Sequence, residues 1–236
     1  MKDAGLAPTP HAGPEGPFVG TPPPARAPRR WAHDEHLDSL LRVLSRIHGP
    51  QRWWPARTPY EVCVGALLVQ HTAWRNVERA LANLRRARLL TPERQLCSAG
   101  DELGAALRPA GTWRLKRTRL LLFADWYLES GGLRALKELP LERARAGLLS
   151  VHGIGPETAD AILCYAAGRR TVVMDAYARR LLERHGLVSS GLHLEELRRW
   201  VAERLVRSQW VHEEFHALCV RAGRSPTQLL QRDPRP

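Results

Sequence analysis

The stretch LSVHGIGPETADAIL, residues 149–163, decides how this chain is interpreted. At its centre Gly153 and Gly155 flank Ile154, and Pro156 follows directly. Glycine allows a tight turn, and proline is favoured at the first position of a helix. The stretch therefore predicts two helices joined by a short hairpin, with Ile154 pointing inward and holding the helices together.

The hairpin turn has the features of a phosphate-binding site. Glycines carry no side chains, so successive backbone N–H groups and the positive end of the next helix can meet a phosphate oxygen. A tight connection between two helices with a capping glycine is the alternative, and it needs no ligand. In the phosphate-binding interpretation, the nucleic-acid contacts come from His152, Gly153, Ile154, Gly155 and Thr158.

The rest of the chain is patterned for helices. Apolar residues recur every three or four positions from residue 37 to 47 and in most later segments, separated by glycine, proline and serine. The one strand-like stretch, residues 171–174, is short and lies between two such segments. The pattern predicts an all-α fold.

The balance of charge favours a polyanionic partner. Lysine and arginine number 36 against 24 for aspartate and glutamate, which gives a net charge of +12 at pH 7. Neutralising phosphates releases counterions and gives affinity that does not depend on base sequence, so nucleic acid is the leading partner. An arginine-rich composition that only solvates helix surfaces is the alternative.

Composition also argues against several classes of protein. No apolar run approaches the roughly 18 residues that span a bilayer, so no membrane role is expected. The start, MKDAGLAPTP, has no apolar signal core, which predicts a cytoplasmic protein. Residues 1–30 are rich in proline and poor in packing residues, which predicts a disordered tail. The cysteines are Cys63, Cys97, Cys164 and Cys219. They are far apart in the sequence, unlike the closely spaced cysteines of a zinc or iron–sulfur site.

A carboxylate follows the hairpin. Asp175 comes 20 residues after Gly155, behind Gly168 and the apolar stretch 172–174. Taken alone, an aspartate before Ala-Tyr-Ala is typical of a helix N-cap. Near a phosphate-binding hairpin, the same carboxylate becomes a candidate catalyst.

The order of hairpin, helix, glycine-containing loop and Asp175 resembles the helix-hairpin-helix DNA glycosylase superfamily, which includes endonuclease III. The resemblance implies that Asp175 lies at the lip of the active-site cleft and is catalytic. Breaking an N-glycosidic bond builds positive charge on the deoxyribose, and a nearby carboxylate stabilises that charge and can orient the attacking water. The sequence departs from the family where Arg169 and Arg170 replace a proline before the aspartate.

The resemblance also bears on strand cleavage. In bifunctional members, a lysine two residues after the second hairpin glycine forms a Schiff base with the sugar, and here that position is Glu157. The lysines of the chain are Lys2, Lys116 and Lys137. We therefore expect a monofunctional glycosylase that uses water. No cofactor is expected, and in particular no iron–sulfur cluster, although an alkali or magnesium ion could bind at the hairpin.

A second resemblance concerns the base. Residues 53–55, 59–62 and 65–77 are similar to the endonuclease III-related branch that contains 3-methyladenine DNA glycosylases. The similarity implies a pocket of Trp53, Trp54 and Trp74, whose faces would stack on a flat cationic purine. It also implies that Gln70 enters the duplex at the vacated base position, with His71 beside it in place of the family's asparagine. Tryptophans that form a buried corner of the core are the alternative.

Taken together, these resemblances imply two helical lobes with the active site in the cleft between them. Residues 61–186 would form a six-helix barrel with the hairpin, and residues 31–60 and 187–236 would form the other lobe. The expected partner is double-stranded DNA with damaged bases, bound by a monomer in a bacterial-type, nucleoid-associated setting. A glycosylase for oxidised or deaminated pyrimidines, and a non-catalytic DNA-binding protein, remain the alternatives.

Overall fold

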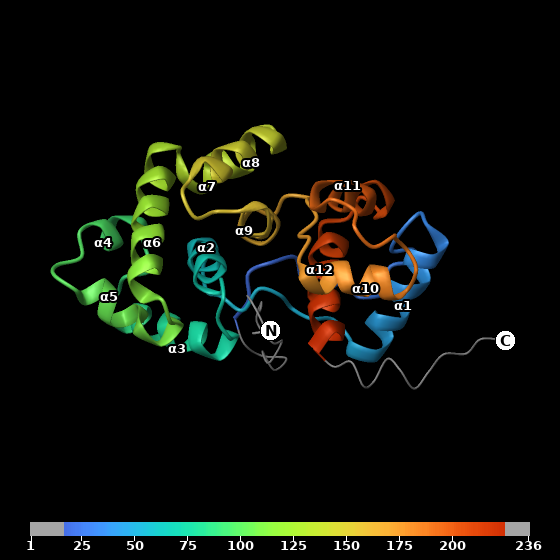
Figure 1. The fold of residues 1–236 in the computed structure, drawn as a ribbon, viewed down its shortest axis with the longest axis horizontal. Coiled ribbons are helices and arrows are strands. Elements are labelled where there is room, and N and C mark those ends of the chain that lie inside the picture. Colours follow the sequence, from blue (N-terminus) through green and yellow to red (C-terminus); the bar gives the residue numbers. More distant parts are fainter. Residues whose placement is uncertain (1–16, 225–236) are drawn as a thin grey trace. The chain divides into compact units, whose positions relative to one another are not determined.

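The computed structural model describes residues 17–224, and within them the chain is all-α, as the sequence predicts (Figure 1). In this range the stretch 171–174 joins no sheet, and a single backbone bridge pairs Ala32 with Leu205. No helix of the described part is both long and apolar enough to cross a membrane.

In chain order the helices are α1 (Glu35–His48), α2 (Pro59–Leu68), α3 (Trp74–Arg86), α4 (Pro92–Leu96), α5 (Glu102–Leu107), the 3₁₀ helix η1 (Arg108–Ala110), α6 (Trp113–Glu129), α7 (Gly132–Glu138), α8 (Leu141–Ser150), α9 (Pro156–Ala161), the π-helix η2 (Ile162–Ala166), α10 (Ala176–Arg184), α11 (Leu194–Arg204) and α12 (Gln209–Arg224).

The described residues form two compact units. The first contains residues 17–19 and 54–169, and the second contains residues 20–53 and 170–224. These boundaries differ from the expected division at residues 60/61 and 186/187. Asp175 and α10 belong to the unit built from the terminal segments, because the apolar side chains of residues 172–182 pack into that unit's core.

Helix α2 lies inside the first unit. It begins where the Thr58 hydroxyl accepts the N–H of Glu61, with Pro59 in the first turn. Its residues from 60 to 68 are all buried, as expected for a helix that is apolar all round. The carboxylate of Glu61 is the one charge on the helix, and Arg85 of α3 neutralises it, with Nε 3.0 Å from Oε1.

The predicted hairpin lies between α8 and α9 in the same unit. Ile154 in the turn is buried, as predicted. A buried ion pair joins the two helices, since Arg145 of α8 donates through Nε and Nη2 to both carboxylate oxygens of Asp160 on α9, at 2.9 and 3.0 Å. Two parallel charge-assisted bonds fix geometry as well as adding energy, so this pair sets how the hairpin is held.

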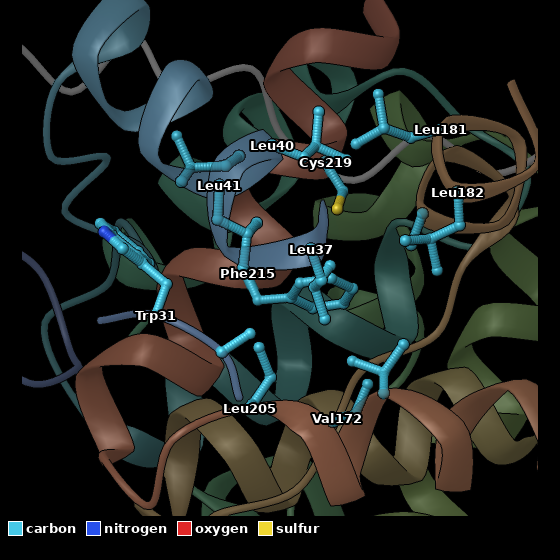
Figure 2. Packing of buried hydrophobic residues seen from close by; sticks show 14 of the residues in the cluster. Trp31, Leu37, Leu40, Leu41, Val172, Leu181, Leu182, Leu205, Phe215 and Cys219 are labelled. Carbon is cyan, nitrogen blue, oxygen red and sulfur yellow. The ribbon is translucent and has the colours of Figure 1, made fainter. Parts of the chain in front are cut away.

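The second unit has one apolar core, shown from close by in Figure 2. Helix α1 faces it with leucines at helical spacing, and Asp34 caps that helix by accepting the N–H of Leu37. The segment 172–182 and helices α11 and α12 also contribute to the core. Labelled in Figure 2 are Trp31, Leu37, Leu40, Leu41, Val172, Leu181, Leu182, Leu205, Phe215 and Cys219.

The tail predicted over residues 1–30 includes residues that contact the rest of the chain. Residues 1–16 lie outside the described residues. Beyond them, the backbones of Val19 and Trp54 exchange two hydrogen bonds of 2.8 Å. Thr21 donates through its backbone N–H and its hydroxyl to the carboxylate of Glu213, at 2.7 and 3.1 Å. Proline-rich composition did not reveal these anchors because they use backbone groups and partners far away in the sequence.

We expect Asp160→Ala to lower the free energy of unfolding by about 3–5 kcal/mol, because it removes the carboxylate that neutralises the buried Arg145 guanidinium. Urea unfolding followed by circular dichroism measures this. Glu183→Ala is the control, since its pair with Arg179 spans 3.7 Å at the surface and should be worth less than about 1 kcal/mol. Equal effects of the two substitutions would contradict the role given to the buried pair.

Candidate functional site

The hairpin turn offers one covered and one open glycine. Gly153 has φ +90°, and a Cβ there would lie 2.5 Å from Nε of Arg119, which packs over it from α6. Gly155 is extended, and a Cβ there would meet nothing within 4 Å. His152 and Glu157 on either side are exposed. A ligand can therefore approach the turn at Gly155, whereas Arg119 occupies the side of Gly153.

Gln70 is tied to the hairpin. Its Nε2 donates to the carbonyl oxygen of Gly153 and to Oγ1 of Thr158, both at 3.0 Å. Its Oε1 accepts from Nη1 of Arg119. The structure thus brings together three residues that the sequence analysis selected, Gln70, Gly153 and Thr158. His71 follows in a left-handed conformation, φ +56°, and is exposed.

Arg119 is a member of this cluster that sequence reasoning missed. It is one of several basic residues in the first turns of α6, and no motif distinguishes it from the others. Its contact with Gln70 joins positions 49 residues apart, which periodicity cannot reveal.

The three candidate pocket tryptophans fall into two groups. Trp54 and Trp74 lie in the first unit, with their rings edge to face and the ring centroids 5.9 Å apart. The centroids of Trp54 and Tyr165 are 5.5 Å apart. Trp53 belongs to the second unit, where the centroids of its ring and of the His216 ring lie 6.4 Å apart in a T-shaped arrangement. All three are buried. The indole N–H of Trp74 has no hydrogen-bond acceptor among the described residues.

Asp175 caps α10 in the second unit, as the alternative interpretation predicts. Its Oδ1 accepts the N–H of Ala178 at 2.7 Å. Its Oδ2 lies 3.7 Å from Nε2 of His216 on α12, and both side chains are buried. One turn later on α12, burial and then the charge of Asp175 raise the pKa of the Cys219 thiol well above its ordinary value. The cap therefore uses one carboxylate oxygen and leaves the other for a second role.

The loop that carries Trp53 is held by a buried acid that sequence reasoning also missed. The Glu214 carboxylate of α12 accepts the backbone N–H of Gln51 at 3.0 and 3.1 Å, and it also bonds the backbone of Arg52. Burial raises the pKa of Glu214 to about 8. Arg52 has φ +48°, a conformation that persists only where the surroundings impose it. Glu214 thus fixes the turn that presents Trp53.

The cysteines do not fit an iron–sulfur cluster. Cys63 is buried in α2 and Cys164 in η2, Cys97 follows α4, and Cys219 lies in α12. Within the described part of the chain, no three side chains of histidine, cysteine, aspartate or glutamate come together as metal ligands.

Comparison with known proteins decides the family. A protein of Methanocaldococcus jannaschii, named as a candidate DNA repair glycosylase, is 38% identical over 189 residues, which cover 79% of this chain and 86% of the relative. The chain belongs to the helix-hairpin-helix DNA glycosylase superfamily, the endonuclease III-like proteins. No family model matches it. The relative is archaeal, so the comparison gives no support to a protein of bacterial type.

Solved glycosylases share the fold. The 3-methyladenine DNA glycosylase MagIII of H. pylori, bound to 1,N6-ethenoadenine, is 25% identical with a TM-score of 0.68 over 80% of this chain and 97% of its own. A trapped covalent intermediate of endonuclease III with DNA has a TM-score of 0.67 at 18% identity, over 80% and 85%. The all-α architecture of this glycosylase is thus that of proteins solved with DNA or with a modified base.

We expect Gly153→Ala to destabilise this glycosylase by about 1–3 kcal/mol, because alanine is strained at φ +90° and its methyl group would collide with Arg119. Gly155→Ala should change the free energy of unfolding by less than about 0.5 kcal/mol, since its site is open and its backbone is extended. Thermal unfolding of the two variants side by side checks this. An equal loss of stability would contradict the described turn.

Proposed function

We propose that this chain is a monofunctional DNA glycosylase that hydrolyses the N-glycosidic bond of an alkylated purine, such as 3-methyladenine, in double-stranded DNA. The observation that carries the proposal is the geometry of Asp175. Its Oδ1 is anchored by Ala178, and its Oδ2 is not used by the cap. A carboxylate held in this way can act on charge that develops beside it without first reorganising.

The chemistry follows from the bond that is broken. As the base leaves, the deoxyribose takes on oxocarbenium character, and a negative carboxylate near C1′ lowers the energy of that state. Burial strengthens the effect, because Coulomb interactions are screened less away from water. The same carboxylate can orient the water that attacks the sugar. Asp175 therefore acts by charge and position and need not form a covalent bond.

The lysines support hydrolysis over a Schiff base. Glu157 stands at the lyase position on the first turn of α9 and is exposed. In the described range the chain has two lysines, and Lys137 lies on α7. Burial and the neighbouring Arg119 lower the pKa of Lys116 to about 8, which would suit a nucleophile. However, its Nζ is buried and donates to the carbonyl oxygen of Ala110 at 2.6 Å, so it is not presented to a substrate.

Two observations favour an alkylated purine. MagIII, at 25% identity, is a 3-methyladenine glycosylase that was solved with a modified purine. Among the described residues the buried indole N–H of Trp74 has no acceptor, and a bound base or a water molecule could supply one. Alkylation also weakens the glycosidic bond, so an enzyme that lacks a strong acid for the leaving group can still release such a base.

The hairpin supplies the DNA contact in this proposal. The open backbone at Gly155 would meet a phosphate, and an alkali or magnesium ion there could bridge the two. Gln70, with His71 beside it, would face the duplex from the loop after α2. The three hydrogen bonds that Gln70 makes to the hairpin and to Arg119 must then break before its amide can fill a vacated base position. The reaction as proposed uses a monomer.

Asp175→Asn should slow base release from methylated duplex DNA by about 100-fold or more in single-turnover assays, because it removes the negative charge. Asparagine is a good N-cap, so α10 and the fold should be retained. Asp34→Asn is a matched control, since Asp34 caps α1 with the same bond, to the N–H of Leu37 at 2.9 Å. Equal rates for wild type and Asp175→Asn would rule out the catalytic role.

Borohydride should trap no covalent complex between the wild-type protein and methylated or abasic DNA, because no lysine stands at position 157 and Lys116 is buried. Denaturing gel electrophoresis of the reduced mixture checks this, and a bifunctional endonuclease III serves as the positive control. A trapped band that persists in Lys116→Arg and Lys137→Arg variants would reveal another amine nucleophile. Any stoichiometric trapping by the wild type contradicts a purely hydrolytic mechanism.

A further inference from the structure

The second unit contains a histidine that faces the candidate catalyst. His216 lies on α12, which packs against α10 (Figure 1). Its Nε2 lies 3.7 Å from Oδ2 of Asp175, and 2% and 5% of the two side chains are exposed. The distance exceeds that of a hydrogen bond but suits an ion pair when the imidazole is protonated.

The two oxygens of Asp175 thus have different neighbours. The N–H of Ala178 fixes Oδ1 at 2.7 Å, while the imidazole of His216 faces Oδ2. With a donor on one oxygen and an imidazole beside the other, rotation about the Cβ–Cγ bond of Asp175 is restricted. A catalytic group needs such support, because small errors in orientation reduce the rate steeply.

His216 is itself in contact with Trp53, the candidate pocket residue of the second unit. The ring of Trp53 contacts it at 6.4 Å with an interplanar angle of 84°. Glu214, two residues before His216 on α12, anchors the backbone of the loop that carries Trp53. The carboxylate of Glu213 is bonded to Thr21 and Gln209. A connected series of contacts therefore runs from the loop at residues 51–53 through Trp53 and His216 to Asp175.

We infer that His216 is a positioning residue for Asp175, and that it sets the orientation of the carboxylate before DNA binds. The inference rests on the proposed function, since it assigns His216 a role in the same base release. Trp53 then acts on the reaction through His216 as well as through any contact with the base. Loss of the imidazole should slow the bond-breaking step and leave DNA affinity unchanged.

Two substitutions separate positioning from packing. His216→Gln keeps a polar nitrogen near the place of Nε2, whereas His216→Phe keeps a ring beside Trp53 but removes the nitrogen that faces Oδ2. The phenylalanine variant should be at least as stable as the glutamine variant, because glutamine brings buried polar atoms that lack matched partners. The rates should rank the other way, with His216→Phe about 10- to 100-fold slower than wild type and His216→Gln in between.

The experiment measures the single-turnover rate and the half-saturating protein concentration on methylated duplex DNA, together with the melting temperature of each variant. His36→Gln is the control for the exchange of histidine by glutamine, since His36 is exposed on α1. Should neither His216 variant fold, His216→Ala with added imidazole replaces them, and recovery of the rate is then the expected result.

The outcomes test the role of His216 separately from the proposed function. If His216→Phe releases the base as fast as His216→Gln or faster, the positioning role is overturned. The same holds if added imidazole fails to restore the rate of His216→Ala. A change confined to DNA affinity overturns it as well. If Asp175→Asn retains the wild-type rate, the proposed function itself fails. If Asp175→Asn is slow while the His216 variants match wild type, only this inference fails.

Discussion

The hydrogen bond from the N–H of Ala178 to Oδ1 of Asp175 is the constraint on which the proposed chemistry depends. It starts α10 and at the same time holds the carboxylate in one place. The apolar side chains of residues 172–182 pack into the core of the second unit, so this helix start cannot shift without disturbing that core. Capping and catalysis, which the sequence presented as alternatives, are therefore compatible, because each can use a different oxygen of the same carboxylate.

In both units, buried polar contacts hold a candidate functional segment in place. In the first unit, the Arg145–Asp160 pair holds the hairpin helices, and Gln70 and Arg119 hold its turn. In the second unit, Glu214 holds the loop before Trp53. Such groups are expensive to bury unless they are satisfied, and once satisfied they permit few alternative arrangements. Within its own unit, each of the hairpin and the carboxylate is thus held in one arrangement before a substrate binds.

The parts of the site that the sequence revealed are those encoded locally. Two glycines and a proline specify the hairpin, Ile154 points inward as expected, and Asp175 stands before a helix. What the sequence missed joins distant segments. The unit boundary separates Trp53 from the adjacent Trp54, although nothing in the local pattern marks it. His216, Arg119 and Glu214 lie on regular helices, where helical spacing tells which face is buried but not which buried polar group meets which partner.

The most direct test of the account is a panel of duplexes that carry 3-methyladenine, 7-methylguanine, uracil or an oxidised pyrimidine, each incubated with the wild-type protein. One half of every reaction is treated with alkali, which breaks the strand at abasic sites, and the other half is not. We expect strand breaks at the methylpurines only after alkali, since hydrolysis leaves an intact abasic strand. Breaks without alkali, release confined to uracil or oxidised pyrimidines, or binding without any release would contradict it.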